Sequence, residues 1–234
     1  MTFEQAKKIF QNAGLDLYEM QFRQLSTYLE KLVETNQHFN LTSIIEPAEI
    51  WAKHFLDSAV LLQKIPISIG SHYLDVGTGA GFPGMVLAIL RPDLQVTLLD
   101  SLQKRVDFLV DLAEYLGIDN VRCVHARVED AAKMTEYREK FDFVTARAVA
   151  ALPVLLEYCL PFVKLGGMFC AMKGPSESGR DVENAAWTLG GSFQQEVNDT
   201  LENVGQRRLI LFEKVEKTPA QYPRRGDKIQ KKPL

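Results

Sequence analysis

The chain has 234 residues, of which 46% are hydrophobic and 24% charged, a composition that fits a globular protein with one substantial core. Its uncharged apolar stretches fall far short of the roughly 20 residues that a transmembrane helix needs. The charged N-terminus lacks the apolar core of a signal peptide. We therefore expect a cytoplasmic protein, monomeric and without a membrane partner.

The cysteines and the charges narrow the possibilities further. Cys123, Cys159 and Cys170 form no C-x-x-C pair and stand among apolar neighbours, so we expect buried thiols and neither a metal site nor a disulfide framework. The net charge is −3, yet the C-terminal residues 217–234 are strongly basic. Two interpretations of this tail remain open: an element that contacts phosphates, or a solvated, disordered end.

The first 65 residues are predicted to be helical. Apolar residues recur at helical spacing before Gly14, which ends the first helix. A longer helix is expected from about Tyr18 to Asn36, and another from Pro47 through Leu62. No strand-like alternation occurs there, so residues 1–65 are interpreted as an N-terminal helical extension packed on the core.

From residue 72 onward, short apolar strands alternate with segments of helical length, which is typical of βαβ units and a parallel sheet. The segments 192–197 and 207–212, separated by the polar connection 198–206, predict an antiparallel hairpin on the sheet edge. We thus predict an α/β, Rossmann-like domain over 66–215 with a mostly parallel seven-stranded sheet, followed by an extended basic tail over 216–234. The other predicted strands are Tyr73–Val76, Gln95–Leu99, Val121–His125, Phe141–Thr145 and Gly167–Met172, and the predicted helices are Pro83–Leu90, Leu102–Leu116 and one near Ala151–Val163.

The strongest local signal is a glycine loop at the end of the first strand. Its sequence is Leu74-Asp75-Val76-Gly77-Thr78-Gly79-Ala80-Gly81-Phe82-Pro83-Gly84. Such a loop lets a ligand lie directly on the backbone, next to the free N–H groups of the following helix. Asp100 ends the next strand, where a carboxylate can accept hydrogen bonds from the ribose hydroxyls of an adenosine.

Two cofactors fit these residues. The pattern Gly79-x-Gly81-x-x-Gly84 also matches the dinucleotide fingerprint, so a nicotinamide-dependent oxidoreductase is the competing enzyme class. Asp75 favours S-adenosylmethionine, because a carboxylate at the mouth of the loop would attract an ammonium group and repel a pyrophosphate. The C-terminal hairpin also differs from a second mononucleotide-binding half. Two further alternatives remain: glycines that only form a tight turn, and a non-catalytic RNA-binding module that keeps the loop as a relic.

On these residues the chain resembles the bacterial 16S ribosomal RNA guanine-N7 methyltransferases, also called the glucose-inhibited division protein B family. The resemblance covers essentially the whole chain. Its other motifs are Phe39-Asn40-Leu41-Thr42, His54-Phe55-Leu56-Asp57-Ser58, Leu99-Asp100-Ser101, Arg127-Val128-Glu129, Ala146-Arg147-Ala148, Lys173-Gly174 and Pro223-Arg224-Arg225. It implies the class I methyltransferase fold and S-adenosylmethionine-dependent methylation of N7 of one guanine, position 527 in rRNA numbering. The implied substrate is 16S rRNA or the small ribosomal subunit.

The expected site residues come from the resemblance and from the patterns together. The resemblance implies cofactor contacts at Gly77, Phe82, Val128, Glu129 and Arg147, and the loop pattern adds Asp75, Gly79 and Asp100. Structural alternatives stay open: Phe82 as part of the core, Glu129 as a surface charge at a helix start, and Arg147 as an ion-pair partner of Asp142 or Asp75. The residues expected to bind RNA are Arg224, Arg225, Lys228, Lys231 and Lys232.

The implied chemistry requires alignment more than acid–base catalysis. Guanine N7 has a lone pair and no proton to lose, so methyl transfer to it needs no general base. The sequence therefore assigns no catalytic nucleophile. Arg147 and Lys173, at the ends of strands, are candidates for orienting the guanine, and His54 and His125 are titratable alternatives. Because N7 faces a narrow groove in A-form RNA, the target base is expected to be unpaired or extruded.

Overall fold

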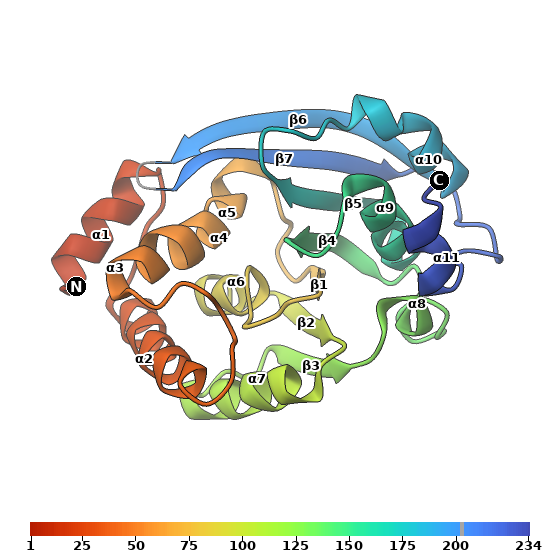
Figure 1. Cartoon of the computed structure of the whole chain (residues 1–234). Coiled ribbons are helices and arrows are strands. Elements are labelled where there is room, and N and C mark those ends of the chain that lie inside the picture. The colour runs from red at the N-terminus through yellow and green to blue at the C-terminus, as the bar shows by residue number, and fades with distance from the viewer. Residues whose placement is uncertain (202–203) are drawn as a thin grey trace.

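The computed structural model describes residues 1–201 and 204–234, which surround one central sheet. The sheet has seven strands in the order β3-β2-β1-β4-β5-β7-β6 (Figure 1). The first five strands run parallel, and β7 is antiparallel to both β5 and β6. The strands are β1 (His72–Val76), β2 (Gln95–Asp100), β3 (Val121–His125), β4 (Phe141–Arg147), β5 (Val163–Lys173), β6 (Gly191–Leu201) and β7 (Gly205–Lys214).

Helices cover both faces of this sheet (Figure 1). One face carries α1 (Phe3–Asn12), α2 (Glu19–Asn36), α3 (Pro47–Ile50), the π-helical turn η1 (Trp51–Leu56), α4 (Asp57–Ala59), α5 (Leu61–Lys64), α6 (Gly84–Leu90) and α7 (Gln103–Leu116). The other face carries α8 (Val128–Ala131), α9 (Leu152–Cys159), α10 (Glu183–Thr188) and α11 (Gly226–Lys231), with the short 3-10 turns η2 (Leu160–Phe162) and η3 (Arg180–Val182). The α/β prediction is confirmed.

The strands contribute side chains to two apolar cores, one on each face of the sheet. Successive side chains of a strand point to opposite faces, so Tyr73 lies in the core beneath α1 to α7, whereas Leu74 lies in the core beneath α8 to α11. Helix α2 belongs to the first core through Leu25, Tyr28 and Leu32, none of which has exposed surface. The N-terminal helices therefore share a core with the sheet.

The predicted C-terminal hairpin is present, but its strands are longer than expected. The polar residues Asn198 and Asp199 pair in register with Arg208 and Arg207, so most of the predicted connection is strand. Glu202 and Asn203, also in that connection, lie outside the described residues. Because β7 runs antiparallel between β5 and β6, the sheet departs from the 3-2-1-4-5-6 order of dinucleotide-binding enzymes.

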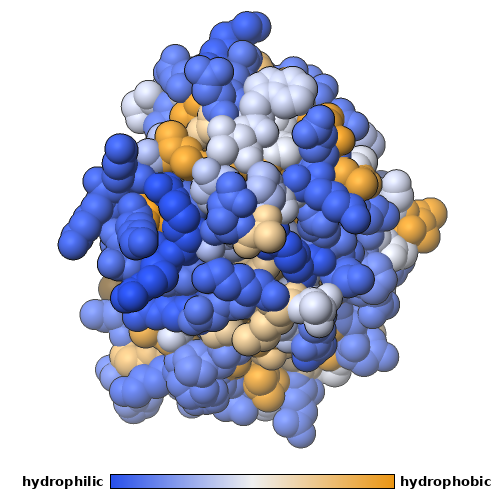
Figure 2. All heavy atoms as spheres, turned by 90° about the vertical axis from the view of Figure 1, so that its right-hand side faces the viewer, coloured by the Kyte–Doolittle hydropathy of each residue, from blue (hydrophilic) through white to orange (hydrophobic). Residues whose placement is uncertain are grey.

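The prediction of an extended C-terminal tail is wrong. Arg224 forms an ion pair with Glu157 of α9 (Nη2 to Oε2, 2.5 Å), whose side chain has no exposed surface. Ile229 of α11 is fully buried in the second core. A helix of six residues spans fewer than two turns, too short for an apolar period to show. On the outside, the part of the molecule formed by α8 to α11 shows mostly hydrophilic residues (Figure 2).

Candidate functional site

The glycine loop connects β1 to α6 at the carboxyl edge of the parallel strands. Gly77, Gly79 and Gly81 have φ angles of 66°, 61° and 106°, in the left-handed region that favours glycine. Gly81 serves packing, because an added Cβ would lie 2.5 Å from the Tyr28 hydroxyl. Gly79 instead faces open space, with nothing within 4 Å of an added Cβ. A ligand can therefore lie against the backbone at Gly79.

The structure brings Asp100 to the glycine loop, as predicted from its place at the end of β2. Its Oδ2 accepts a hydrogen bond from the Gly79 N–H (2.9 Å), and its Oδ1 accepts one from the Leu102 N–H (3.0 Å). Arg105 Nη1 lies 3.4 Å from Oδ2. A carboxylate has about four acceptor positions; these contacts occupy three of them and Asp100 is 3% exposed, so one position remains for a hydroxyl group of a ligand.

Asp75 does not stand at the mouth of the loop, and that prediction is wrong. The side chain has no exposed surface. It accepts hydrogen bonds from Thr78 Oγ1 (2.7 Å), the Gly84 N–H (2.9 Å) and Thr145 Oγ1 (3.1 Å). Burial raises the pKa of Asp75 to about 6 although these hydrogen bonds oppose the rise. The carboxyl group thus braces the loop from beneath and is closed to a ligand.

The ring of Phe82 belongs to an aromatic cluster at the inner end of the loop. It is 5% exposed and stacks on Tyr28 and His54, with ring centroids 5.4 Å and 4.3 Å apart. The guanidinium carbon of Arg147 lies 5.2 Å from the ring centroid. The Phe82 ring is therefore part of the core, as the structural alternative proposed. A contact between Phe82 and a cofactor stays a prediction.

Two further predicted residues lie at the same edge of the sheet, where β3 leads into α8. Val128 and Glu129 form the first turn of α8 and are half-buried. Parallel strands end at a common edge, and β1, β2 and β3 are neighbours in the sheet. Gly77, Asp100 and Glu129 therefore lie at or just after the carboxyl ends of three adjacent strands, the arrangement in which open α/β sheets bind nucleotides.

Arg147 ends β4 and pairs with neither Asp142 nor Asp75. Its Nη1 donates to Asp57 Oδ2 (2.9 Å), and its Nη2 lies 3.3 Å from His54 Nδ1. Arg207 of β7 donates through Nε to the other oxygen of Asp57 (2.8 Å). One buried carboxylate of the N-terminal extension thus holds the guanidinium groups of two strands.

A basic cavity of about 360 Å³ lies around these residues, at the carboxyl ends of β4 and β5. Its lining has four cations and one carboxylate; Glu49 pairs with Lys53 and Glu177 with Lys173, which leaves one positive charge in excess. This excess favours an anionic ligand. Burial, followed by the charge of Arg147, lowers the pKa of His54 to about 4, so this imidazole is neutral near pH 7. The lining residues are Ile44, Lys53, His54, Asp57, Arg147, Ala148, Met172, Lys173, Gly174 and Arg207.

Besides lining the basic cavity, Lys173 holds the segment that follows β4. Its Nζ donates to the Ala150 carbonyl and pairs with Glu177 (2.7 Å), which also accepts the Leu152 N–H (2.6 Å). Lys173 therefore anchors the segment between β4 and α9. Within that segment Val149 covers Gly77, since a Cβ added to Gly77 would lie 2.6 Å from Val149 Cγ2.

Sequence reasoning did not single out Lys53, Asp57 and Arg207 for this site. Asp57 was visible only as part of the His54–Ser58 motif, and Arg207 only as one residue of a strand. The Lys53 carbonyl and the Asp57 carboxylate, from one helical segment, both accept from Arg147, and Arg207 shares Asp57 with it. His125, one of the titratable alternatives, is exposed and contacts the Ser101 carbonyl (3.1 Å) outside the basic cavity.

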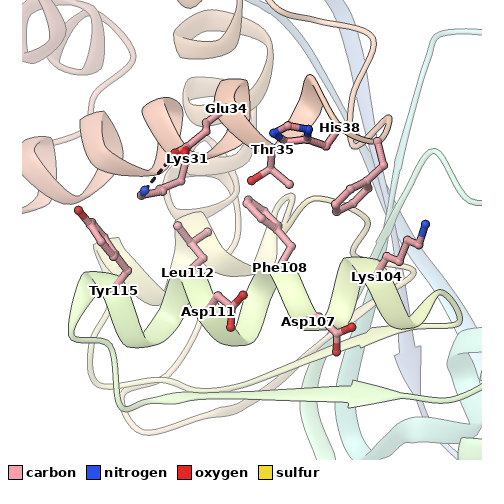
Figure 3. A pocket seen from close by; sticks show the side chains of 11 residues that line it. Lys31, Glu34, Thr35, His38, Lys104, Asp107, Phe108, Asp111, Leu112 and Tyr115 are labelled. Atoms are coloured by element: carbon pink, nitrogen blue, oxygen red, sulfur yellow. Dashed lines mark hydrogen bonds and ion pairs between the residues drawn. The ribbon is translucent and has the colours of Figure 1, made fainter.

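A larger cavity of about 630 Å³ lies between α2 and α7 (Figure 3). Its walls mix aromatic rings with charges of both signs, and Lys31 is already paired with Glu34 (3.0 Å). Its three carboxylates outnumber its two lysines, so it lacks the positive excess of the basic cavity. The lining residues are Lys31, Glu34, Thr35, His38, Phe39, Lys104, Asp107, Phe108, Asp111, Leu112 and Tyr115.

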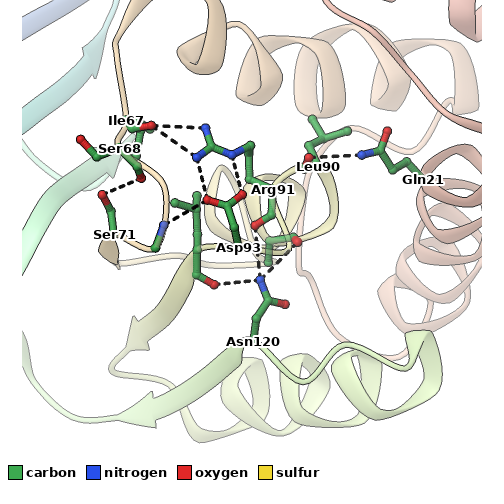
Figure 4. Close-up of polar contacts among 11 residues, drawn as sticks. Gln21, Ile67, Ser68, Ser71, Leu90, Arg91, Asp93 and Asn120 are labelled. Atoms are coloured by element: carbon green, nitrogen blue, oxygen red, sulfur yellow. Dashed lines mark hydrogen bonds and ion pairs between the residues drawn. The ribbon is translucent and has the colours of Figure 1, made fainter.

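The amino edge of the sheet carries a structural network instead of a site (Figure 4). Arg91 and Asp93 form a two-point ion pair, with both N–O distances at 2.7 Å. Asn120 donates to the Leu94 carbonyl (3.0 Å), and Gln21 of α2 donates to the Leu90 carbonyl (3.2 Å). These contacts close the sheet at the end opposite the glycine loop.

The residues expected to bind RNA divide into two groups. Arg224 is engaged with Glu157 through its backbone N–H and its guanidinium group. Arg225, Lys228, Lys231 and Lys232 are exposed on α11 and at its ends. Within residues 1–201 and 204–234, no helix is long and apolar enough to cross a membrane, and no group of three or more potential metal ligands gathers.

Comparisons with known proteins agree with this geometry. A family model described as rRNA small subunit methyltransferase G matches residues 21–210. The chain is 48% identical over 223 residues to ribosomal RNA small subunit methyltransferase G of Lactobacillus delbrueckii subsp. bulgaricus, covering 93% of each protein. It is 44% identical to the protein of that name from Leuconostoc mesenteroides, over the full length of both chains.

Solved structures show the same fold at low sequence identity. A SAM-dependent methyltransferase from Aquifex aeolicus matches 73% of this chain and 94% of its own, with a TM-score of 0.55 and 20% identity. M. jannaschii TYW2, solved in complex with AdoMet, matches 64% of this chain and 72% of its own, with a TM-score of 0.52 and 16% identity. These likenesses establish the class I methyltransferase fold for this chain.

Proposed function

Because the chain belongs to the family of rRNA small subunit methyltransferase G, we propose that it transfers a methyl group from S-adenosyl-L-methionine to N7 of one guanine of 16S rRNA. The target is the guanine that the resemblance implied, position 527 in rRNA numbering. The enzyme acts as a monomer on the rRNA or the small ribosomal subunit, in the cytoplasm.

The carboxyl edge of β1, β2 and β3 supplies residues that fit the cofactor. The open backbone at Gly79 would lie against it, and Asp100 would accept hydrogen bonds from its ribose hydroxyls. Val128 and Glu129 would flank its adenine, while Gly77 and Arg147 would lie toward its methionine end. When bound, S-adenosyl-L-methionine supplies an electrophilic methyl carbon on a sulfonium.

The observation that carries the proposal is the basic cavity beside the glycine loop. It lies at the ends of β4 and β5; its residue Arg147 stands over the Phe82 ring, and Val149, two residues after Arg147, packs against Gly77. Arg147 and Arg207, fixed by Asp57, provide donors for guanine O6 or for a nearby phosphate. A single extruded guanine nucleotide therefore fits the chemistry of this cavity.

The groups in the cavity suit alignment and do not suit proton abstraction. Burial and the charge of Arg147 lower the pKa of His54 to about 4, so this imidazole is a weak base. Guanine N7 needs none, because it attacks through a lone pair that carries no proton. The residues therefore hold the base and its phosphate in line with the cofactor and exclude water.

Methyl transfer to small-subunit RNA that carries 7-deazaguanine at the target position tests this proposal. The substitution removes the nucleophilic nitrogen and keeps the Watson–Crick edge. We expect incorporation of labelled methyl into unmodified RNA and none into the deaza RNA, with binding of both. Continued transfer to the deaza RNA would show that another atom is the acceptor and would overturn the N7 assignment.

A further inference from the structure

The C-terminal segment from Thr218 to Lys231, here called the C-terminal strap, is fastened across the α8 and α9 side of the sheet. Arg138 donates to the carbonyls of Thr218 (2.8 Å) and Tyr222 (2.9 Å). Arg224 forms an ion pair with the buried Glu157, and the side chain of Ile229 is buried in the second core. The position of the strap between these anchors is therefore fixed.

Between the anchors, Gly226 faces the carboxylate of Glu129. A Cβ added at Gly226 would lie 2.4 Å from Glu129 Oε1 and 3.1 Å from its Cδ. Glu129 thus rests against the α-carbon of Gly226, a place that any larger residue would fill. The φ angle of Gly226 lies outside the left-handed region, so an alanine here would keep the backbone conformation and would displace the Glu129 carboxylate, the free end of a flexible side chain.

We infer that the C-terminal strap is a positioning element for the cofactor, with Gly226 as the positioning residue that sets the Glu129 carboxylate. The inference rests on the proposed function, which places Glu129 beside the adenine. Glu129 is half-buried at the start of the short helix α8. With Gly226 on one side, its carboxylate has fewer rotamers to lose when a ligand binds, which favours affinity.

Binding of S-adenosylhomocysteine by calorimetry tests this inference in four proteins: the full-length chain, Gly226→Ala, Glu129→Ala and the double variant. Alanine is the better helix former, so a strap that only sealed the core would tolerate Gly226→Ala. We expect Gly226→Ala to bind about tenfold more weakly, the scale of one lost hydrogen bond to a charged group. In the Glu129→Ala background the same change should cost less than about twofold.

Controls keep the outcomes distinct. Gln221→Ala, on the exposed side of the strap, should bind like the unmodified chain. Unchanged affinity in Gly226→Ala, or full additivity with Glu129→Ala, would overturn the inference. If the unmodified chain fails to bind S-adenosylhomocysteine, the proposed cofactor site itself is wrong and the inference falls with it.

Discussion

Asp57 and Arg147 lie 90 residues apart in the sequence and form an ion pair with an Nη1 to Oδ2 distance of 2.9 Å. The second oxygen of Asp57 accepts from Arg207 (2.8 Å), so neither oxygen is left without a guanidinium partner. This carboxylate is contributed by the N-terminal helices, whereas Arg147 ends β4 and Arg207 lies near the start of β7. The helical extension therefore shapes the basic cavity as well as the core.

Replacing Asp57 by asparagine should impair catalysis. The amide lacks the charge and one of the two acceptors, so both arginines lose their fixed orientation, and kcat/KM for methyl transfer should fall about tenfold or more. Asp93→Asn is the matched control, because it also disturbs an Asp–Arg pair but lies at the opposite edge of the sheet (Figure 4). Equal activity in the two variants would remove Asp57 from the site.

Asp100→Ala should weaken cofactor binding. The change removes the acceptor beside the open face of Gly79 and frees the Gly79 N–H. We expect a loss of about 1.5–3 kcal/mol in the binding free energy of S-adenosylhomocysteine, measured by calorimetry on protein whose circular dichroism is unchanged. NADH titrated into the unmodified chain should give no binding heat. A folded variant with full affinity would refute the role of Asp100.

Asp75 should make stability depend on pH. Its pKa rises from 3.8 in the unfolded chain to about 6 in the folded one. Since the folded pKa is the higher one, the stabilising contribution is complete below about pH 4 and is lost as the pH rises through 6. The unfolding free energy of the unmodified chain, relative to Asp75→Asn, should therefore fall by on the order of 3 kcal/mol between pH 4 and pH 7.

Urea unfolding of both proteins at each pH measures that difference and cancels the other titrating groups. A difference that stays constant across this range would mean that Asp75 keeps an ordinary pKa. A difference that grows with pH would mean that its hydrogen bonds to Thr78, Gly84 and Thr145 outweigh burial.

Arg224→Met should destabilise the fold. The change leaves the Glu157 carboxylate buried and unpaired, which costs about 3–5 kcal/mol of unfolding free energy. Replacing Glu157 by methionine as well should restore most of that loss, because two apolar side chains can fill the place of the pair. Thermal denaturation of the single and double variants checks this. Equal melting temperatures for the unmodified chain and Arg224→Met would show that the ion pair contributes nothing to stability.

The exposed cations of the C-terminal strap and its end should act on RNA without acting on the fold. Replacing Arg225, Lys228, Lys231 and Lys232 by glutamine should weaken RNA binding and leave the melting temperature unchanged. The slope of log affinity against log salt should flatten by roughly 0.7 for each phosphate of single-stranded RNA that the variant no longer neutralises. Filter binding over a range of salt concentrations measures it. An unchanged slope would place the RNA on another face.

Local signals in the sequence were enough to predict the architecture and part of the site. The alternation of apolar strands and helices fixed the α/β architecture, because a parallel strand needs a covering helix crossover. The glycine loop and Asp100 could be joined without a structure, since the ends of adjacent parallel strands meet at one edge. The antiparallel hairpin followed from two strand-like segments close together in the chain.

Which charged side chains meet depends on the packing of elements that are far apart in the chain. Asp57 lies 150 residues from Arg207, and Glu157 lies 67 residues from Arg224, so no spacing in the sequence predicts either pair. Asp75 looked like a carboxylate at the mouth of the loop, but the packing of α6 and β4 buries it beneath the loop. Periodicity reports which face of an element is apolar, whereas the partner of a buried charge depends on how the elements pack.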